Sequence, residues 1–172
     1  MDRSPLPIAS DRIRALPAKD CDFQRRRHVR FFKPGIVYHV LFKTLQGFFL
    51  LTPDLEHELR ELIAGVLARA QRNWPEVATY AAVWLSNHGH LMLAGDPGNL
   101  VAFIAFLKRE ISRRWGPKIG WSGPMWGRYE TTALVTPEAQ QRCFEYVLGQ
   151  AVKEDLVTTP QDWPGFHCAQ VL

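Results

Sequence analysis

Residues 87–93 read Asn-His-Gly-His-Leu-Met-Leu and place two imidazoles two positions apart at the start of a short apolar run. If this run is a β-strand, its side chains alternate between two faces, so His88 and His90 point to the same side. Leu91 and Leu93 then point to the opposite side, toward a hydrophobic core. Two imidazoles on one face of a strand form half of a site for a divalent metal ion.

Hydrophobic patterning upstream of this stretch predicts two further strands and a helix. Residues 36–43 and 77–85 are rich in β-branched and aromatic residues, which is typical of strands. Residues 52–54 (Thr-Pro-Asp) resemble a capped helix start. From Leu55 to about residue 72 the apolar residues follow helical spacing. We therefore expect a strand, a helix and a second strand before the two histidines.

Downstream patterning completes the predicted fold. Residues 96–99 begin a second helix with an apolar stripe as far as Trp115, residues 126–135 predict a fourth strand, and a third helix begins at Pro137. The order β-α-β-β-α-β plus a helix predicts an α+β, ferredoxin-like split βαβ fold. Its four-stranded antiparallel sheet carries two helices on one face. The other face is free for a site, which the C-terminal helix can approach.

The third predicted helix carries Tyr146 and Gln150, one turn apart. At the helical repeat the two lie about 40° apart, roughly opposite the apolar face that includes Val147. A metal held by His88 and His90 needs a further protein ligand, and Gln150 can offer an amide oxygen. Imidazole and amide ligands together favour Mn²⁺ or Mg²⁺ over a structural zinc site. A tyrosine beside such a metal could attack a phosphodiester and form a phosphotyrosine.

Composition indicates an ordinary globular chain of 172 residues, with 47% hydrophobic and 22% charged residues. No apolar run approaches the length of a membrane span, and no secretory signal is evident, so no membrane partner is expected. The three cysteines are scattered, and no Cys-x-x-Cys occurs. These features predict a protein of the reducing cytoplasm, associated with the nucleoid if it binds DNA.

The net charge of +4 is unevenly distributed. Residues 1–33 hold nine Lys/Arg against four Asp, and residues 105–130 hold six Lys/Arg against two Glu. We interpret residues 1–33 as a basic N-terminal arm and residues 34–172 as the folded domain. Both basic regions favour a polyanionic partner, although a solvated tail and helix face would look the same. The candidate phosphate contacts are Arg25, Arg26, Arg27, Arg30, Lys108, Arg109, Arg113, Arg114 and Arg128.

Several segments together resemble the single-tyrosine HUH transposases, most closely the REP-associated tyrosine transposases. The resemblance covers roughly residues 34–168. Its motifs are residues 35–40 (Gly-Ile-Val-Tyr-His-Val), 85–91 (Leu-Ser-Asn-His-Gly-His-Leu), 126–129 (Trp-Gly-Arg-Tyr), Tyr146 at the nucleophile position, 152–157 (Val-Lys-Glu-Asp-Leu-Val) and 162–164 (Asp-Trp-Pro).

The resemblance implies a ferredoxin-like nuclease domain in which His88 and His90 bind a divalent metal, Mg²⁺ or Mn²⁺. Tyr146 would attack single-stranded DNA that carries a hairpin, leaving a 5′-phosphotyrosine and a free 3′-hydroxyl. Gln150 stands where related enzymes place the third ligand. The sequence departs from the family at Gly89, which is usually bulky and hydrophobic, and at Gly149. Glycine at both positions is expected to weaken local structure.

Three other functions remain open at this point. The chain could be a domesticated, catalytically weak or inactive DNA-hairpin-binding protein of the same fold. It could be an RNA-binding sheet module, although such modules expose aromatic residues on the sheet, where this chain has His88 and His90. A three-histidine zinc hydrolase would need a third ligand, and His39, in an apolar strand, is expected to be structural. Both a monomer and a homodimer are compatible with the sequence.

Overall fold

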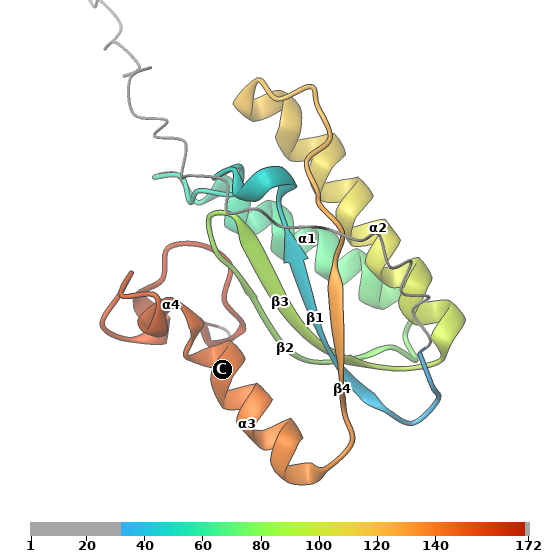
Figure 1. The fold of residues 1–172 in the computed structure, drawn as a ribbon. Coiled ribbons are helices and arrows are strands. Elements are labelled where there is room, and N and C mark those ends of the chain that lie inside the picture. Colours follow the sequence, from blue (N-terminus) through green and yellow to red (C-terminus); the bar gives the residue numbers. More distant parts are fainter. Residues whose placement is uncertain (1–31, 171–172) are drawn as a thin grey trace, which may run out of the picture.

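The computed structural model describes residues 32–170, which form one four-stranded antiparallel sheet covered by helices on both faces (Figure 1). In sheet order the strands are β2 (Ala78–Trp84), β3 (His88–Ala94), β1 (Val37–Lys43) and β4 (Glu130–Leu134). The α-helices are α1 (Glu58–Asn73), α2 (Pro97–Trp115), α3 (Pro137–Leu148) and α4 (Gln150–Lys153). Short 3₁₀ helices are η1 (Leu45–Gly47), η2 (Gly116–Ile119), η3 (Pro160–Asp162) and η4 (Cys168–Gln170).

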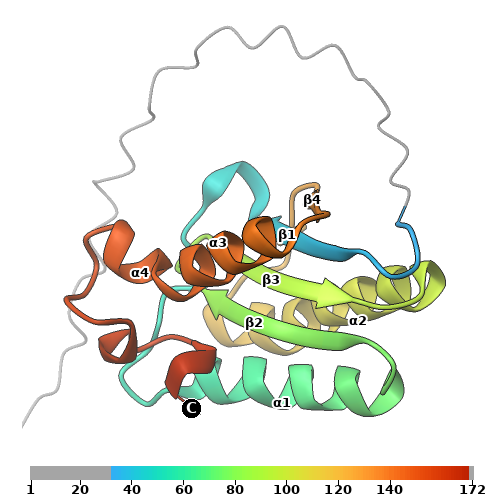
Figure 2. The ribbon, with the colours of Figure 1, turned by 90° about the horizontal axis from the view of Figure 1, so that it is seen from below.

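The layers follow the predicted ferredoxin-like plan, which is thereby confirmed. Figure 2 shows α1 and α2 on one face of the sheet and α3 across the other face. In the sheet β3 lies between β1 and β2, and β1 lies between β3 and β4, so each βαβ unit crosses over one strand. None of the helices between residues 32 and 170 is long and apolar enough to cross a membrane.

Two hydrophobic cores lie on opposite faces of the sheet. Leu91 and Leu93 are fully buried in the larger core, beneath α1 and α2. Met92, between them in sequence, belongs to the smaller core, where it lies with Val147 of α3. The alternation expected for this strand is therefore present, and His90 lies on the α3 side together with Met92.

The first helix begins later than the sequence predicts. α1 starts at Glu58 rather than after Thr52, because the Asp54 carboxylate accepts hydrogen bonds from the backbone N–H of Glu58 (2.8 Å) and Leu59 (2.9 Å). Asp54 thus satisfies donors that a helix start leaves unpaired. Leu55, expected on the apolar face of the helix, precedes it and is fully exposed.

The fourth strand is shorter than predicted. β4 begins at Glu130, whereas residue 126 was expected to start it. Trp126 makes only an isolated bridge to Thr44, and its indole N–H donates to the carbonyl of Lys108 in α2 (2.8 Å). The segment before β4 is therefore held between the end of β1 and α2, and it does not extend the strand ladder.

The C-terminal helix is interrupted at Gly149, so Tyr146 and Gln150 lie on consecutive helices, α3 and α4, and not on one continuous helix as predicted. Glycine is a poor helix former, which accounts for the position of the break. Hydrogen bonds from both helices meet at this residue: Gly149 N–H donates to the carbonyl of Glu145 (2.9 Å), and Lys153 N–H donates to the carbonyl of Gly149 (2.9 Å). Backbone hydrogen bonding therefore links the two helices in spite of the break.

Gly89 lies inside β3, which continues through it, and its missing side chain leaves room for a neighbouring ring. It pairs with Trp84 across the sheet, and a Cβ added to Gly89 would lie 2.7 Å from the indole nitrogen of Trp84. The Trp84 ring is buried and stacks on Phe42, with ring centroids 5.9 Å apart. The Trp84 ring of the neighbouring strand therefore fills the space beside Gly89.

We predict that Gly89→Ala destabilises the fold by about 1–3 kcal/mol, the usual cost of overpacking a core. Combining it with Trp84→Leu should cost less than the sum of the two single changes, because the smaller side chain leaves room for the methyl group. Urea unfolding measures both. Gly65→Ala in α1 is the control, since nothing lies within 4 Å of the added methyl group. Wild-type stability for Gly89→Ala would contradict this account.

Candidate active site

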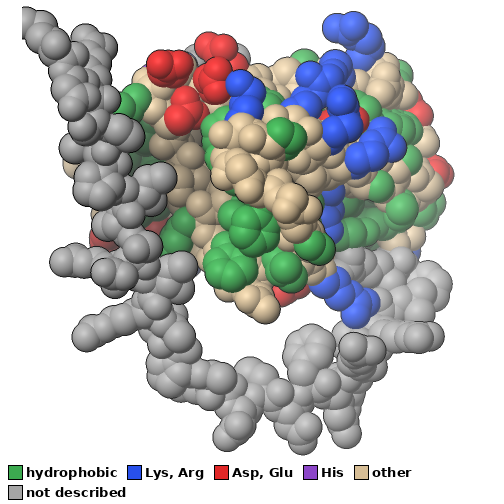
Figure 3. Space-filling model, turned by 90° about the horizontal axis from the view of Figure 1, so that it is seen from above, with side chains coloured by type: hydrophobic (Ala, Val, Ile, Leu, Met, Phe, Trp, Pro, Cys, Tyr) green, Lys and Arg blue, Asp and Glu red, His purple; other side chains and the backbone are tan. Residues whose placement is uncertain are grey.

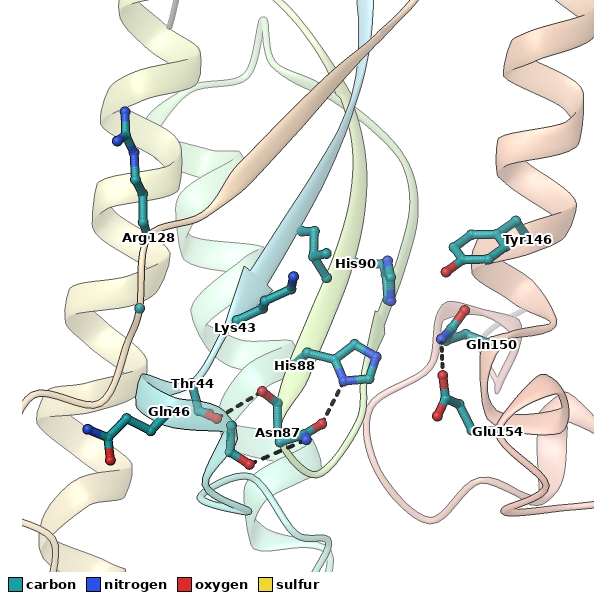
Figure 4. Close-up of a pocket in the computed structure, with 13 residues that line it drawn as sticks. Lys43, Thr44, Gln46, Asn87, His88, His90, Arg128, Tyr146, Gln150 and Glu154 are labelled. Carbon is teal, nitrogen blue, oxygen red and sulfur yellow. Dashed lines mark hydrogen bonds between the residues drawn. The ribbon is translucent and has the colours of Figure 1, made fainter. Parts of the chain in front are cut away.

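A cavity of about 460 Å³ opens where β1 ends and β3 begins, facing α3 and α4 (Figure 4). Its walls come from four segments: the end of β1 with the loop after it, the start of β3, the segment before β4, and the α3–α4 region. His88, His90, Tyr146 and Gln150 all line it. The four residues that the sequence singled out are therefore brought together in one cavity.

Three imidazoles form a row on the sheet face that α3 covers. The ring centroids of His88 and His90 are 5.0 Å apart, with the rings nearly perpendicular. His39, from β1, stacks against His90 at 5.1 Å, and its Nε2 is hydrogen-bonded to Nδ1 of His90 (2.8 Å). His88 and His90 thus share a face, as strand alternation predicts.

In both candidate ligands Nδ1 is already hydrogen-bonded, which leaves Nε2 as the nitrogen that could bind a ligand. His88 Nδ1 is hydrogen-bonded to Oδ1 of Asn87 (2.6 Å), and His90 Nδ1 to His39. His90 Nε2 is buried and has no hydrogen-bond partner among residues 32–170. A partner on one ring nitrogen fixes the orientation of a histidine and leaves the other nitrogen to bind a ligand.

Gln150 presents a third atom of the same kind. Its side chain is only 2% exposed, and its Nε2 donates to Oε1 of Glu154 (2.9 Å). Its Oε1 is buried and has no partner within the described part of the chain. The bond to Glu154 settles which end of the amide carries the oxygen, and Figure 4 shows this oxygen directed toward Tyr146.

A metal ion bound between the two histidines would need the Gln150 amide oxygen as a third protein ligand. Within residues 32–170, no group of three or more His, Cys, Asp or Glu side chains is arranged to hold a metal ion. His88 Nε2, His90 Nε2 and Gln150 Oε1 are the atoms that fit such a role. Two of them are buried polar atoms that have no partner among residues 32–170, and leaving such an atom unpaired is costly.

Tyr146 projects from α3 toward the imidazole row. Its ring lies edge-to-face on His90, with centroids 5.6 Å apart, and on His39 at 6.1 Å. Its side chain remains 38% exposed, and Lys153 Nζ lies 4.4 Å from its ring centroid. The sequence placed Tyr146 opposite the packed face of its helix, which is wrong. The sheet face beneath α3 carries apolar and imidazole rows side by side, so the helix packs across both.

Burial keeps the three imidazoles neutral. Burial is the largest cause that lowers the pKa of His90 to about 3. The nearby groups that are positively charged when protonated lower it further, namely His39, His88, Lys153 and Lys43. Burial also lowers the pKa of His88 and of His39. Neutral imidazole is the form that binds metal ions, so the row is ready to act as ligand at neutral pH.

His39 lies beside the candidate site, a contact that sequence reasoning missed. The sequence suggested a structural role for His39, and the structure places its ring in contact with both His90 and Tyr146. Strand alternation within β1 shows only that His39 shares a face with Leu41. The register of β1 on β3 pairs Leu41 with His90 and so brings His39 diagonally beside His90. That register could not be inferred from the sequence.

The predicted basic residues lie in two different places. Arg128 lines the cavity, whereas three arginines of α2 surround Glu110, which also meets Arg69 of α1 at 3.5 Å. Lys108 Nζ donates to the carbonyl of Gly127 (3.0 Å), beside the cavity wall. Figure 3 shows Lys and Arg side chains gathered over one side of the molecule. The arginines at Glu110 are Arg109, Arg113 and Arg114.

The arginine group has a defined geometry. Glu110 is 7% exposed, and the hydrogen bonds from Arg113 and then Arg114, against the opposing effect of burial, lower its pKa to about 2. One carboxylate thus holds several guanidinium groups together at the surface, and the cluster keeps a net positive charge. Arg25, Arg26, Arg27 and Arg30 lie outside the described residues.

No protein-family model matches the sequence, and neither does any curated protein. Among solved structures, the fold is similar to a REP-associated tyrosine transposase bound to a REP hairpin. The TM-score is 0.65 and the identity 18%, over 83% of this chain and 81% of that one. A candidate transposase from Deinococcus radiodurans R1 also aligns, with a TM-score of 0.46 and 18% identity, over 70% of this chain and 95% of that one.

The first of these likenesses shows that this chain has the fold of a REP-associated tyrosine transposase. The second has a TM-score too low to support a shared fold. At this level of identity the comparison establishes architecture, and the chemistry has to be argued from the residues of the cavity.

Proposed function

We propose that this protein is a metal-dependent, single-tyrosine (HUH-type) nuclease and strand transferase that acts on single-stranded DNA. The observation that carries the proposal concerns two of the five buried side-chain atoms that have no partner among the described residues. These two, His90 Nε2 and Gln150 Oε1, belong to residues that line the cavity beside the Tyr146 ring. A structural histidine or glutamine would normally be satisfied within the fold. Atoms left unsatisfied next to a half-exposed tyrosine favour a catalytic centre.

His88, His90 and Gln150 would hold a divalent ion, Mg²⁺ or Mn²⁺. Each has its second polar atom fixed by a partner, namely Asn87, His39 and Glu154 respectively. Such outer contacts orient metal ligands. When bound, the ion would polarise a phosphoryl oxygen of the substrate.

Tyr146 would act as the nucleophile. Its hydroxyl oxygen bonds to phosphorus as the phenolic proton is lost, and the bond from phosphorus to the 3′ oxygen breaks. The leaving oxygen takes up a proton and becomes a 3′-hydroxyl, while the 5′ side stays joined to Tyr146. Lys153, beside the ring, supplies positive charge close to the attacked phosphate. Because the phosphodiester energy is kept, a second 3′-hydroxyl could reverse the step and rejoin strands.

The proposed substrate is single-stranded DNA with a palindromic hairpin. The solved neighbour that shares this fold is bound to a REP hairpin, and the basic arm and the α2 arginines suit a polyanion. The alternative is a hairpin-binding protein of the same fold that has lost catalysis. Gly149, which interrupts the tyrosine helix just before Gln150, is the observation that favours it.

We predict that Tyr146→Phe abolishes formation of a covalent protein–DNA adduct while leaving folding and DNA binding intact. The change removes one oxygen and keeps the ring that packs on His90. The measurement is a denaturing gel of protein incubated with Mn²⁺ or Mg²⁺ and hairpin oligonucleotides that carry unpaired flanks, followed by peptide mapping of the adduct.

The outcome separates the two functions. DNA attached to Tyr38, Tyr80 or Tyr129, or wild-type cleavage by Tyr146→Phe, would refute the mechanism. Hairpin binding by the wild type without cleavage in either metal would establish the binder.

A second prediction concerns metal affinity, measured with Mn²⁺ by calorimetry in the absence of DNA. His88→Ala should remove most of the binding. His39→Ala should weaken it about 10- to 100-fold, the effect typical of removing the partner that orients a ligand. His39→Gln keeps a hydrogen-bond acceptor for His90 and should recover part of the affinity. Equal Mn²⁺ affinity in wild type and His88→Ala would place the metal elsewhere.

A third prediction concerns the basic regions. Affinity for single-stranded DNA should fall steeply with salt, because cations released from the phosphates drive binding. Deleting residues 1–30 should flatten the plot of log K against log salt concentration, and so should Arg113→Gln with Arg114→Gln, by about 0.7 for each phosphate that is no longer neutralised. A slope that stays unchanged in either variant would show that the corresponding region makes no phosphate contact.

A further inference from the structure

An exposed aromatic surface lies at the end of the molecule where the cavity opens. Phe49 is 72% exposed and Phe48 37% exposed, and the Phe48 ring lies against Trp121, with centroids 5.7 Å apart. We call these three side chains the aromatic ledge. Figure 3 looks onto this end and shows hydrophobic side chains at the surface, with Lys and Arg side chains gathered to one side of them. Exposed apolar groups that lie together commonly mark a binding surface.

The ledge follows directly on the wall of the cavity. Gln46 and Gly47 line the cavity, and Phe48 and Phe49 come next in the chain. The Asn87 side chain links the two features, because its Oδ1 is hydrogen-bonded to His88 Nδ1 while its Nδ2 donates to the carbonyl of Gly47 at 3.4 Å (Figure 4). The side chain that orients a candidate metal ligand therefore also holds the loop that presents the ledge.

Hydrogen bonds hold the backbone of the ledge in place. The buried hydroxyl of Thr44 contacts the carbonyls of Phe48 (2.6 Å) and Asn87 (2.9 Å). The hydroxyl of Thr52 donates to the carbonyl of Phe49 (3.1 Å), and Leu51 N–H donates to the carbonyl of the residue before Asn87 (2.8 Å). The Phe49 ring is thus presented to solvent by an ordered loop, although burying it would remove apolar area from water.

We propose that the aromatic ledge stacks the unpaired bases of the DNA strand that adjoin the phosphate held at Tyr146. The inference rests on the proposed function. A strand that leaves the cavity across Gln46 and Gly47 meets Phe48 and Phe49 next. Flat aromatic rings stack on any base, so such a surface holds a strand without reading its sequence. Arg128 and Lys43, the latter ion-paired to Glu130 at 2.8 Å, lie in the cavity wall, where their positive charge would face the phosphates.

The test measures affinity by fluorescence anisotropy, in EDTA, for a labelled DNA hairpin with an unpaired flank. Phe49→Ala should weaken binding about 5- to 100-fold, the range for removing one base–aromatic stack. Phe49→Leu keeps apolar bulk without the ring and should weaken it similarly, whereas Phe49→Trp should keep wild-type affinity. Leu55→Ala is the matched control, because Leu55 is a fully exposed apolar residue of the same connection and should have no effect.

A blunt-ended hairpin without the unpaired flank supplies the second arm. Its affinity should be the same for wild type and Phe49→Ala. Equal affinity of both proteins for the flanked hairpin would overturn the inference. A change from dimer to monomer in Phe49→Ala by sedimentation velocity, with DNA affinity unchanged, would overturn it too and assign the ledge to a second copy. Because no metal is present, failure to form the Tyr146 adduct in the separate cleavage assay would refute the proposed nuclease without altering this result.

Discussion

The pairing register of β3 between β1 and β2 is the constraint on which the candidate site depends. Leu91 and Leu93 are fully buried beneath α1 and α2, so the intervening positions must face α3. A slip of one residue would send His88 and His90 into the larger core and turn the leucines to the other face. Hydrophobic burial on one side of the sheet therefore fixes the imidazoles on the other side. The same register brings His39 to within a hydrogen bond of His90.

Local sequence patterns predicted what depends on local geometry. Strand alternation was sufficient for the shared face of His88 and His90, and the order of strands and helices was sufficient for the sheet. The contact of His39 with His90 was not predicted because it depends on the pairing of two strands about fifty residues apart. The start of α1 was predicted too early. The Asp54 carboxylate accepts from the N–H of Glu58, four residues later, so the helix begins there and not after Thr52.

Gly89 and Gly149, which suggested a weakened protein, have different consequences in the fold. At Gly89 the missing side chain is replaced by the Trp84 ring from β2, so packing is kept and the pair has to be considered together. At Gly149 the helix is interrupted, and backbone hydrogen bonds from both helices meet at this residue. The carbonyl just before it, that of Leu148, contacts the buried ring of His167 (2.8 Å). The C-terminal tail thereby supports the turn that places Gln150.

The cost of burying unpaired polar atoms also favours a ligand-binding role for the cavity. A buried polar atom without a partner costs about 1–3 kcal/mol. His90 Nε2 and Gln150 Oε1, which have no partner within residues 32–170, each carry such a cost while their residues line one cavity. Protonation does not relieve it at neutral pH, because burial lowers the pKa of His90 to about 3. A cation would satisfy both atoms at once, whereas an apolar ligand would satisfy neither. Their partners, His39 and Glu154, keep the two side chains from turning away. The two atoms therefore support the proposal that this cavity binds a cation.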